Sequence, residues 1–213
     1  FGAALAERAR IIGNAENKII KLNEILSNLK PSPYTLFYCA EGVVHDEFIL
    51  ENEIVEEESR QVDDVTELLY NLNWKSSRFT SSEITKSRKE ILSNFKDKTI
   101  DALVAMKCLD EGIDIPLTKT AFIIASSANP RQHIQRRGRI LRTHKDKEKA
   151  TIYDFFVNLP VADESDKYSK RLITSELKRV NEFSKLALNH HETYNTLRPI
   201  LINYGMEELL VTN

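Results

Sequence analysis

Short apolar runs alternate with segments of helical periodicity through the middle of the sequence. The runs at 34–40, 100–105, 120–126 and 150–157 are rich in aliphatic and aromatic residues. Strands that are apolar throughout, rather than alternating with polar residues, are typical of parallel sheets buried on both faces. The pattern therefore predicts a three-layer α/β fold, with a mainly parallel sheet covered by helices on both faces.

Helical patterns lie on both sides of this region. Apolar residues recur at three- and four-residue steps through the first thirty residues, until two closely spaced prolines stop the helix. A second apolar stripe at helical spacing follows residue 160. We therefore expect an amino-terminal helix at 1–30, the α/β domain at 31–160 and a helical extension at 161–213. The sequence begins at Phe1, inside a helical pattern, and we expect it to be a fragment of a longer protein.

The composition excludes several classes of protein. The formal net charge is -2, so the chain as a whole is not a general binder of polyanions. Cys39 and Cys108 fit neither a disulfide framework nor a Cys-x-x-Cys metal site, and we expect a reducing, cytoplasmic location and no metal site. No apolar run approaches the ~18 residues of a membrane span, so we expect no membrane association. The acidic segment 41–58 is expected to be a solvated loop or insertion, since so many like charges cannot be buried without partners.

A cluster of arginines stands out within this near-neutral chain. The stretch from Arg131 to Arg142 carries five arginines and no aspartate or glutamate. Asn129 and Pro130 are a helix cap and a first helical residue, so the cluster is predicted to lie on a helix from about 130 to 141. Arginines at three-residue spacing on a helix project in similar directions. Such a fork requires a phosphate, a carboxylate or a nucleic-acid backbone opposite it.

Three segments, taken in order, give the sequence a specific resemblance. The segments YTLFYCA at 34–40, ALVAMKCLDEGIDIP at 102–116 and NPRQHIQRRGRILR at 129–142 resemble motifs IV, V and VI of superfamily-two helicases. The similarity is to DEAD/DEAH-type enzymes related to XPB-like repair helicases and to restriction-system translocases. It implies a RecA-like domain of the P-loop NTPase type, followed by a helical extension.

The resemblance also implies what this chain lacks. In that family, two RecA-like domains close on ATP, and the first supplies a Walker A loop and an acidic Mg²⁺ ligand. No G-x-x-x-x-G-K-[ST] arrangement occurs anywhere in this sequence. The chain therefore resembles the second domain only and is expected not to hydrolyse ATP by itself. ATP and Mg²⁺ would be bound mainly by an N-terminal RecA-like domain of the same protein, and the other partner would be nucleic acid, with DNA expected.

The family motifs imply roles in nucleotide chemistry for five residues of this chain. Arg136 and Arg139 are expected to be the arginine fingers that reach the γ-phosphate, where charge spreads over the phosphoryl oxygens in the transition state. Gln135 is expected to bind the nucleotide or to orient the fingers. Gly112 would let the backbone approach the nucleotide, and Asp114 would accept a hydrogen bond from the ribose. A turn-forming role in the loop is the alternative for Asp114.

Four further residues are candidates for contact with a nucleic-acid phosphate. A short strand is also predicted at 77–80, and Thr80, Ser81 and Arg88 lie at or after its end, at the edge where α/β sheets place their ligands. Helix capping explains Thr80 and Ser81 equally well. Lys107 stands where many family members have a threonine that contacts a phosphate, so charge would replace the hydroxyl contact.

Two other functions remain open for a chain of this kind. One is an ATP-driven translocase of a restriction system that does not separate strands. The other is a non-catalytic module that binds nucleic acid or protein and has kept the fold. A binding module has no need for Gln135, Arg136, Arg139, Gly112 and Asp114 together, so their combination favours the motor domain.

Overall fold

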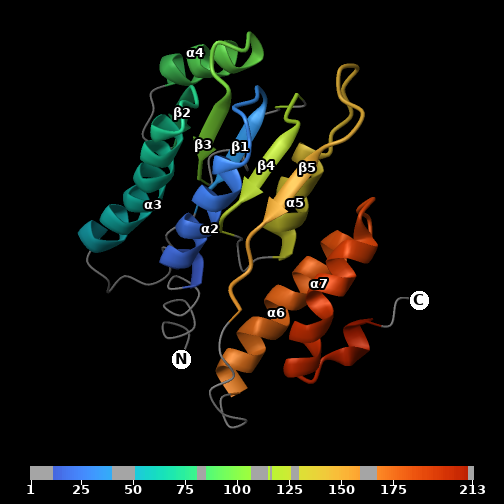
Figure 1. Ribbon diagram of the computed structural model, residues 1–213. Helices are drawn as coiled ribbons and strands as arrows, with labels where there is room; N and C mark the ends of the chain where they lie inside the picture. The colour runs from blue at the N-terminus through green and yellow to red at the C-terminus, as the bar shows by residue number, and fades with distance from the viewer. Residues whose placement is uncertain are drawn as a thin grey trace. The chain divides into compact units, whose positions relative to one another are not determined.

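The computed structural model describes residues 12–39, 51–80, 85–106, 115, 117–125, 130–158 and 167–210. Its centre is a five-stranded sheet with the strand order β2-β3-β1-β4-β5 (Figure 1). The strands are β1 (Thr35–Tyr38), β2 (Ser76–Phe79), β3 (Ala102–Ala105), β4 (Thr120–Ile123) and β5 (Thr151–Asp154). Every neighbouring pair is parallel. The predicted α/β class and parallel sheet are therefore confirmed.

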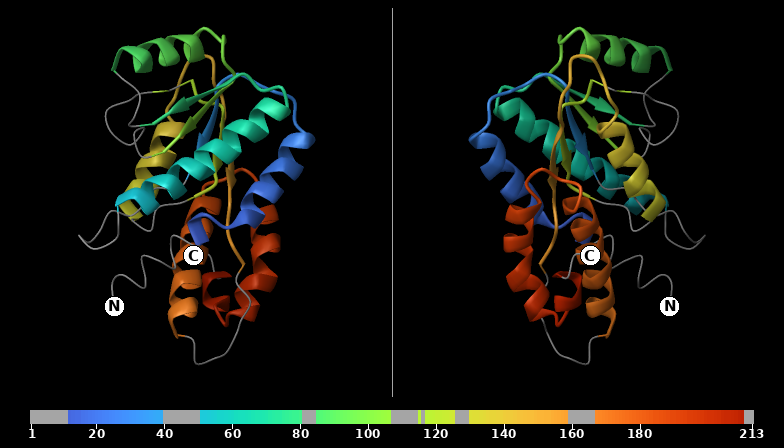
Figure 2. Two further views of the ribbon diagram at one scale, coloured as in Figure 1. Left: turned by 90° about the vertical axis from the view of Figure 1, so that its left-hand side faces the viewer. Right: turned by 90° about the vertical axis from the view of Figure 1, so that its right-hand side faces the viewer.

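Helices cover the two faces of this sheet. They are α2 (Glu16–Ser27), α3 (Glu51–Asn71), α4 (Thr85–Lys96) and α5 (Pro130–Ile140). Figure 2 shows α2 on one side of the sheet and α5 on the other. Such coverage is required because the central strands carry apolar side chains toward both faces.

The start of α3 corrects one prediction. The segment 41–58 was expected to be a loop, but its second half forms the first turns of α3, which begins at Glu51. Glutamate is a good helix former, so a helix can begin here without the apolar periodicity that would have revealed it. The expected exposure of the acidic side chains at 41–58 concerns side chains outside the described residues.

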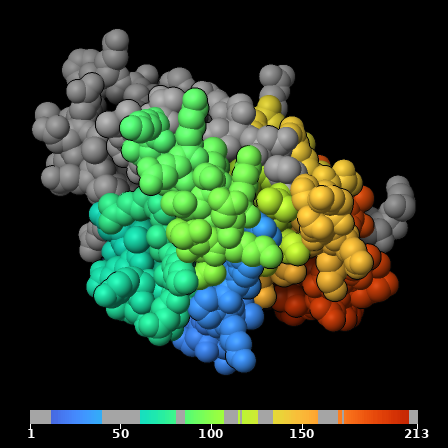
Figure 3. Space-filling view, turned by 90° about the horizontal axis from the view of Figure 1, so that it is seen from above, coloured from blue at the N-terminus to red at the C-terminus, as the bar shows by residue number. Residues whose placement is uncertain are grey.

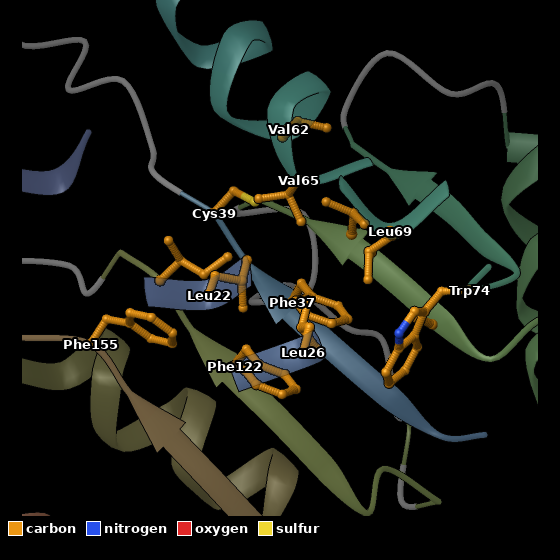
Figure 4. Packing of buried hydrophobic residues seen from close by; sticks show 13 residues of the cluster. Leu22, Leu26, Phe37, Cys39, Val62, Val65, Leu69, Trp74, Phe122 and Phe155 are labelled. Atoms are coloured by element: carbon orange, nitrogen blue, oxygen red, sulfur yellow. The ribbon is translucent and has the colours of Figure 1, made fainter. Parts of the chain in front are cut away.

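An aromatic ladder crosses the sheet on the face that α2 and α3 cover. The rings of Phe37 and Phe122 stack with their centroids 4.7 Å apart, and those of Phe122 and Tyr153 at 4.5 Å. The strand register places these three side chains level on β1, β4 and β5. Trp74 packs edge-on against Phe37 with a centroid distance of 6.0 Å (Figure 4). Helix residues complete this core: Leu22, Leu26, Val62, Val65 and Leu69. The amino-terminal helix α2 is thus part of the core of the sheet domain.

The second compact unit of the chain begins after the sheet. The contacts divide the chain into one unit at Phe1–Phe155 and another at Phe156–Asn213. The second unit consists of α6 (Lys167–Ser184), α7 (His190–Asn203) and the short 3₁₀ helix η2 (Glu207–Leu210). Its core is formed by Ile173, Leu177, Leu197, Leu201, Tyr204 and Met206. Neither this unit nor the rest of the described chain contains a helix long and apolar enough to cross a membrane.

Candidate nucleotide and nucleic-acid site

The carboxyl-terminal edge of the sheet gathers the segments in which the candidate residues lie. All five strands run in one direction, so the segments after Tyr38, Phe79, Ala105 and Ile123 leave the sheet at the same edge. This is the edge at which open α/β sheets bind their ligands. Four predicted residues, Ser81, Lys107, Gly112 and Asp114, lie outside the described residues, and their roles stay predictions.

The arginine cluster lies on α5, as the sequence indicated, but its members have different surroundings. Arg136 is buried with 1% of its surface exposed. Arg139, one turn further on, is partly exposed, and Gln135 is exposed. Residues three apart on a helix differ by about 60° in direction. That difference is enough to turn one arginine toward the sheet and the next toward the margin of the helix.

Arg136 is held within its own domain. Its Nη1 donates a hydrogen bond to the carbonyl oxygen of Ala125, at 3.4 Å, and its guanidinium carbon lies 5.2 Å from the centroid of the Tyr38 ring. Ala125 follows β4 and Tyr38 ends β1. The side chain therefore connects α5 to the ends of two adjacent strands. Tyr38 alternates with Phe37 along β1 and so faces away from the aromatic ladder.

The buried guanidinium remains a cation in this position. Desolvation lowers the pKa of Arg136, and the electrostatic effect of Tyr38 opposes that shift. Arginine side chains are not deprotonated in proteins, so the group stays a cation. The face of the Tyr38 ring and the Ala125 carbonyl are both favourable partners for a buried cation.

Gly138 lies between the partly exposed arginine and the buried one on α5. A Cβ at position 138 would meet nothing within 4 Å, so no neighbour in the described part of the domain requires a glycine there. The residue is exposed.

Thr80 and Arg88 are brought together at the end of β2. Arg88 Nη2 donates a hydrogen bond to the backbone carbonyl of Thr80 at 2.8 Å, and its guanidinium carbon lies 5.9 Å from the centroid of the Phe79 ring. Thr80 is 6% exposed. One nitrogen of Arg88 thus fixes the point at which the chain leaves β2. The predicted capping box that begins at Thr80 continues into residues outside the described part, and α4 is described from Thr85.

Cys39 also lies at this edge, just after β1. It is a free thiol and is fully buried. Burial raises the pKa of the thiol well above its ordinary value, and the charge of Asp64 adds to the effect. A thiol that stays protonated is a poor nucleophile, so Cys39 acts as a core residue.

The sequence did not identify the partners of Arg136. Tyr38 lies inside the motif IV strand, and its position next to inward-facing Phe37 was a usable signal that its ring faces the other helix layer. Nothing in the sequence indicated the Ala125 carbonyl. Among the described residues, no three His, Cys, Asp or Glu side chains come together as metal ligands.

Comparisons with known proteins agree with this architecture. Residues 47–144 match the family described as helicase conserved C-terminal domain. The chain is 31% identical over 147 residues to the DNA 3'-5' translocase XPB2 of Sulfurisphaera tokodaii, covering 67% of this chain and 27% of that protein. It is 29% identical over 86 residues to Putative helicase 22 of a Sulfolobus islandicus filamentous virus, covering 40% of this chain and 15% of that protein. The chain thus spans about a quarter, or less, of these relatives.

Two solved structures share the fold. The yeast DEAD-box splicing factor Prp28 aligns with a TM-score of 0.55 at 19% identity, over 84% of this chain and 34% of that one. The E. coli DEAD-box protein SrmB, solved with regulator of ribonuclease activity A, aligns with a TM-score of 0.53 at 15% identity, over 77% of this chain and 78% of that one. At these identities the likeness establishes the fold alone.

Proposed function

The chain contains a C-terminal RecA-like domain of a superfamily-two helicase, and from this premise we propose that it is the second motor domain of an ATP-dependent helicase or translocase. In this proposal a first RecA-like domain of the same protein holds ATP and Mg²⁺. The present domain closes on that site and adds positive charge where the transition state needs it. DNA is the proposed track, because one relative carries the name of a DNA translocase.

The contrast between Arg139 and Arg136 carries this proposal. Arg136 fastens α5 to the ends of β1 and β4, while Arg139 lies one turn further and is partly exposed. A helix fixed in this way presents the Arg139 side chain from a rigid support. Rigid placement matters because an arginine stabilises a transition state only if it needs no reorganisation during the reaction. We assign the contact with the γ-phosphate to Arg139, and to Arg136 the support of that contact.

The other nucleotide contacts are proposed on the family resemblance. Gln135 is exposed on α5, next to the supporting arginine, where its amide can bind the nucleotide. Gly112 and Asp114 would meet the nucleotide from the segment after β3.

The nucleic-acid contacts are proposed at the same edge of the sheet. Lys107 and Ser81 would meet phosphates directly. Thr80 and Arg88 also have a structural role, because Arg88 donates a hydrogen bond to the Thr80 carbonyl and so holds the end of β2. Only the donors of Arg88 that are not used in that bond remain for a phosphate. Arg88 therefore both shapes the end of β2 and contributes positive charge to the track.

The purified chain is expected to show no ATP hydrolysis at any nucleic-acid concentration. The sequence contains no phosphate-binding loop of the Walker type, and an arginine finger accelerates hydrolysis only of a nucleotide that is already held. Phosphate release from the chain, measured with saturating single-stranded DNA, should equal the buffer blank, with the intact protein as the positive control. Turnover by the chain that disappears in Arg139→Ala would overturn the assignment as a second domain.

Lys107→Ala in the intact protein is expected to weaken single-strand binding and to lower its dependence on salt. A lysine on a phosphate releases a counterion, so the slope of log affinity against log salt should fall by ~0.7. Basal ATPase should not change. Lys178→Ala, which removes an exposed lysine from α6, is the matched control. Wild-type affinity and slope in Lys107→Ala would place the track elsewhere.

A further inference from the structure

Several exposed lysines lie at the amino-terminal edge of the sheet, opposite the candidate site. The register places Thr35 level with Ala102 and with Thr120, Ser76 level with Ala102, and Thr120 level with Thr151. The residues just before these positions therefore form one row in the strand order. From β2 to β5 the row consists of Lys75, Asp101, Tyr34, Lys119 and Ala150.

Further lysines surround this row. We define the basic edge as six of the exposed lysines in the segments that lead into the strands: Lys30, Lys75, Lys96, Lys98, Lys119 and Lys149. None of the six forms an ion pair with another described residue. Figure 3 views the molecule from this side, and the segments that carry the lysines, coloured from blue through green to yellow-orange, meet on one face.

The ring of Tyr34 contacts two of these lysines. The ammonium nitrogens of Lys98 and Lys119 each lie 5.8 Å from the centroid of the Tyr34 ring. The ring is held by Phe95, edge-on at 5.8 Å, and its hydroxyl donates to the carbonyl of Lys96 at 3.1 Å. Cation–π contacts of this kind are weak but directional. The two cations are therefore partly ordered before any ligand arrives.

The backbone at this edge is strained. Three described residues other than glycine have positive φ, namely Tyr34 at 67°, Asn73 at 60° and Lys98 at 62°. All three lie in turns that lead into strands at this edge. Asparagine adopts this conformation readily, but tyrosine and lysine do so at a cost of about 1 kcal/mol or more. Lys98 occupies the position after α4 where helices usually place a glycine, and it adopts a conformation that its own backbone disfavours.

We propose that the basic edge binds the phosphate backbone of duplex nucleic acid, as a second contact surface apart from the carboxyl-terminal edge. A duplex carries one negative charge per ~1.7 Å of its axis. Adjacent strands lie about 4.8 Å apart, so a row across the sheet presents its cations over a span of several phosphates. This surface is separate from the site of the proposed function. The two have only the class of ligand, nucleic acid, in common.

The chemistry of the basic edge favours a phosphate backbone over an acidic protein. Protein interfaces have an apolar centre and are depleted in lysine. Among the described residues, the segments that lead into the strands carry the six exposed lysines of the basic edge but three exposed large apolar side chains, Leu29, Tyr70 and Leu141. Lysines without ordered acidic partners suit a ligand that is held by charge and without sequence preference.

Four acids lie close to the basic edge and do not cancel it. Asp101 accepts a hydrogen bond from the backbone nitrogen of Lys75 at 3.0 Å, and Asp97 accepts one from Ser93 at 3.3 Å. Asp146 pairs with His144 in the loop before β5, and Glu148 is the neighbour of Lys149. The hydrogen bonds from neutral donors leave the charges of Asp97 and Asp101 in place, so the surplus is one of number: six lysines against four acids give two formal positive charges.

Neutralising three lysines of the basic edge tests the proposal. The purified chain is titrated onto a fluorescein-labelled 20-base-pair DNA duplex across a series of salt concentrations. The triple variant Lys75→Gln, Lys98→Gln and Lys119→Gln should lower the salt slope by about 2–3 units, at ~0.9 for each contact. Affinity at low salt should fall by about tenfold or more. The double variant Lys75→Gln and Lys119→Gln leaves Lys98, with its strained backbone, unchanged. It should lower the salt slope by about two units.

The matched control carries the same change of charge in the second unit. Lys170→Gln, Lys178→Gln and Lys185→Gln removes three exposed lysines and should leave the slope close to wild type. No duplex binding by the wild-type chain, or equal losses in the control, would overturn the proposal. If the chain binds labelled polyglutamate more tightly than duplex DNA, and the triple variant loses that binding, the ligand of this edge is an acidic protein and the proposal is overturned. Lys107→Ala separates this inference from the proposed function. If Lys107→Ala weakens nucleic-acid binding and the triple variant does not, the proposed function stands and only this inference is overturned.

Discussion

Arg139→Ala in the intact protein is expected to lower kcat for ATP hydrolysis by at least two orders of magnitude while nucleotide binding is nearly retained. A finger of this kind contributes ~10³ to 10⁵ in rate, which corresponds to about 4–7 kcal/mol of barrier. The interaction is made in the transition state and not in the ground state, so kcat and kcat/KM should fall together. Arg139 is partly exposed, so its truncation should leave the stability of the domain close to wild type.

Two further variants separate this role from a general effect of charge. Arg139→Lys keeps the charge but loses the planar fork, and should recover only part of the rate. Lys86→Ala removes one exposed cation from α4 and should hydrolyse ATP at the wild-type rate. Steady-state phosphate release at saturating ATP and DNA measures all three. Wild-type turnover in Arg139→Ala would contradict the assignment of Arg139 as the arginine finger.

Arg136→Ala is expected to destabilise the sheet domain by about 2–4 kcal/mol. Truncation of a large, fully buried side chain leaves a cavity, and here it also removes the hydrogen bond to Ala125 and the contact with Tyr38. Its kcat should fall as well, because α5 loses its attachment to the strand ends. The loss of activity in Arg136→Ala therefore comes with a loss of stability, whereas the loss in Arg139→Ala does not.

Urea denaturation followed by tryptophan fluorescence measures this difference. Trp74 is the single tryptophan of the chain and lies in the sheet core at 5% exposure, so its signal reports the sheet domain and not the helical unit. Arg136→Met fills most of the same volume without a charge, and should lose much less stability than Arg136→Ala. An unchanged midpoint in Arg136→Ala, together with a large loss of kcat, would show that Arg136 serves ATP directly.

The class of fold could be predicted from the sequence because apolar runs and helical stripes are local patterns. The predicted strand at 34–40 contains β1, and the predicted helix from 130 to 141 agrees with α5 within one residue. The start of α3 was missed because its first turns are acidic and carry no apolar stripe. The strand order could not be derived from the residues, since it depends on which buried faces meet.

The roles of the two arginines show where local reasoning stops. Their spacing predicts that both project to one side of α5, but burial depends on which part of that side faces the sheet. A difference of about 60° places Arg136 against Tyr38 and leaves Arg139 partly exposed. The basic edge is a similar case. Lys75, Lys98 and Lys119 are far apart in the sequence, and only the parallel register brings them to one edge.

The affinity of the intact protein for ADP with aluminium fluoride, compared with ADP alone, tests most directly whether this domain supplies an arginine to the transition state. Aluminium fluoride takes the place of the phosphoryl group in transfer, and tight binding of such an analogue reports complementarity to the transition state. For Arg139→Ala we predict at least a hundredfold weaker binding of the fluoride complex, with the affinity for ADP unchanged. Equal affinity of Arg139→Ala and wild type for the fluoride complex would contradict the assignment of this chain as the arginine-supplying motor domain.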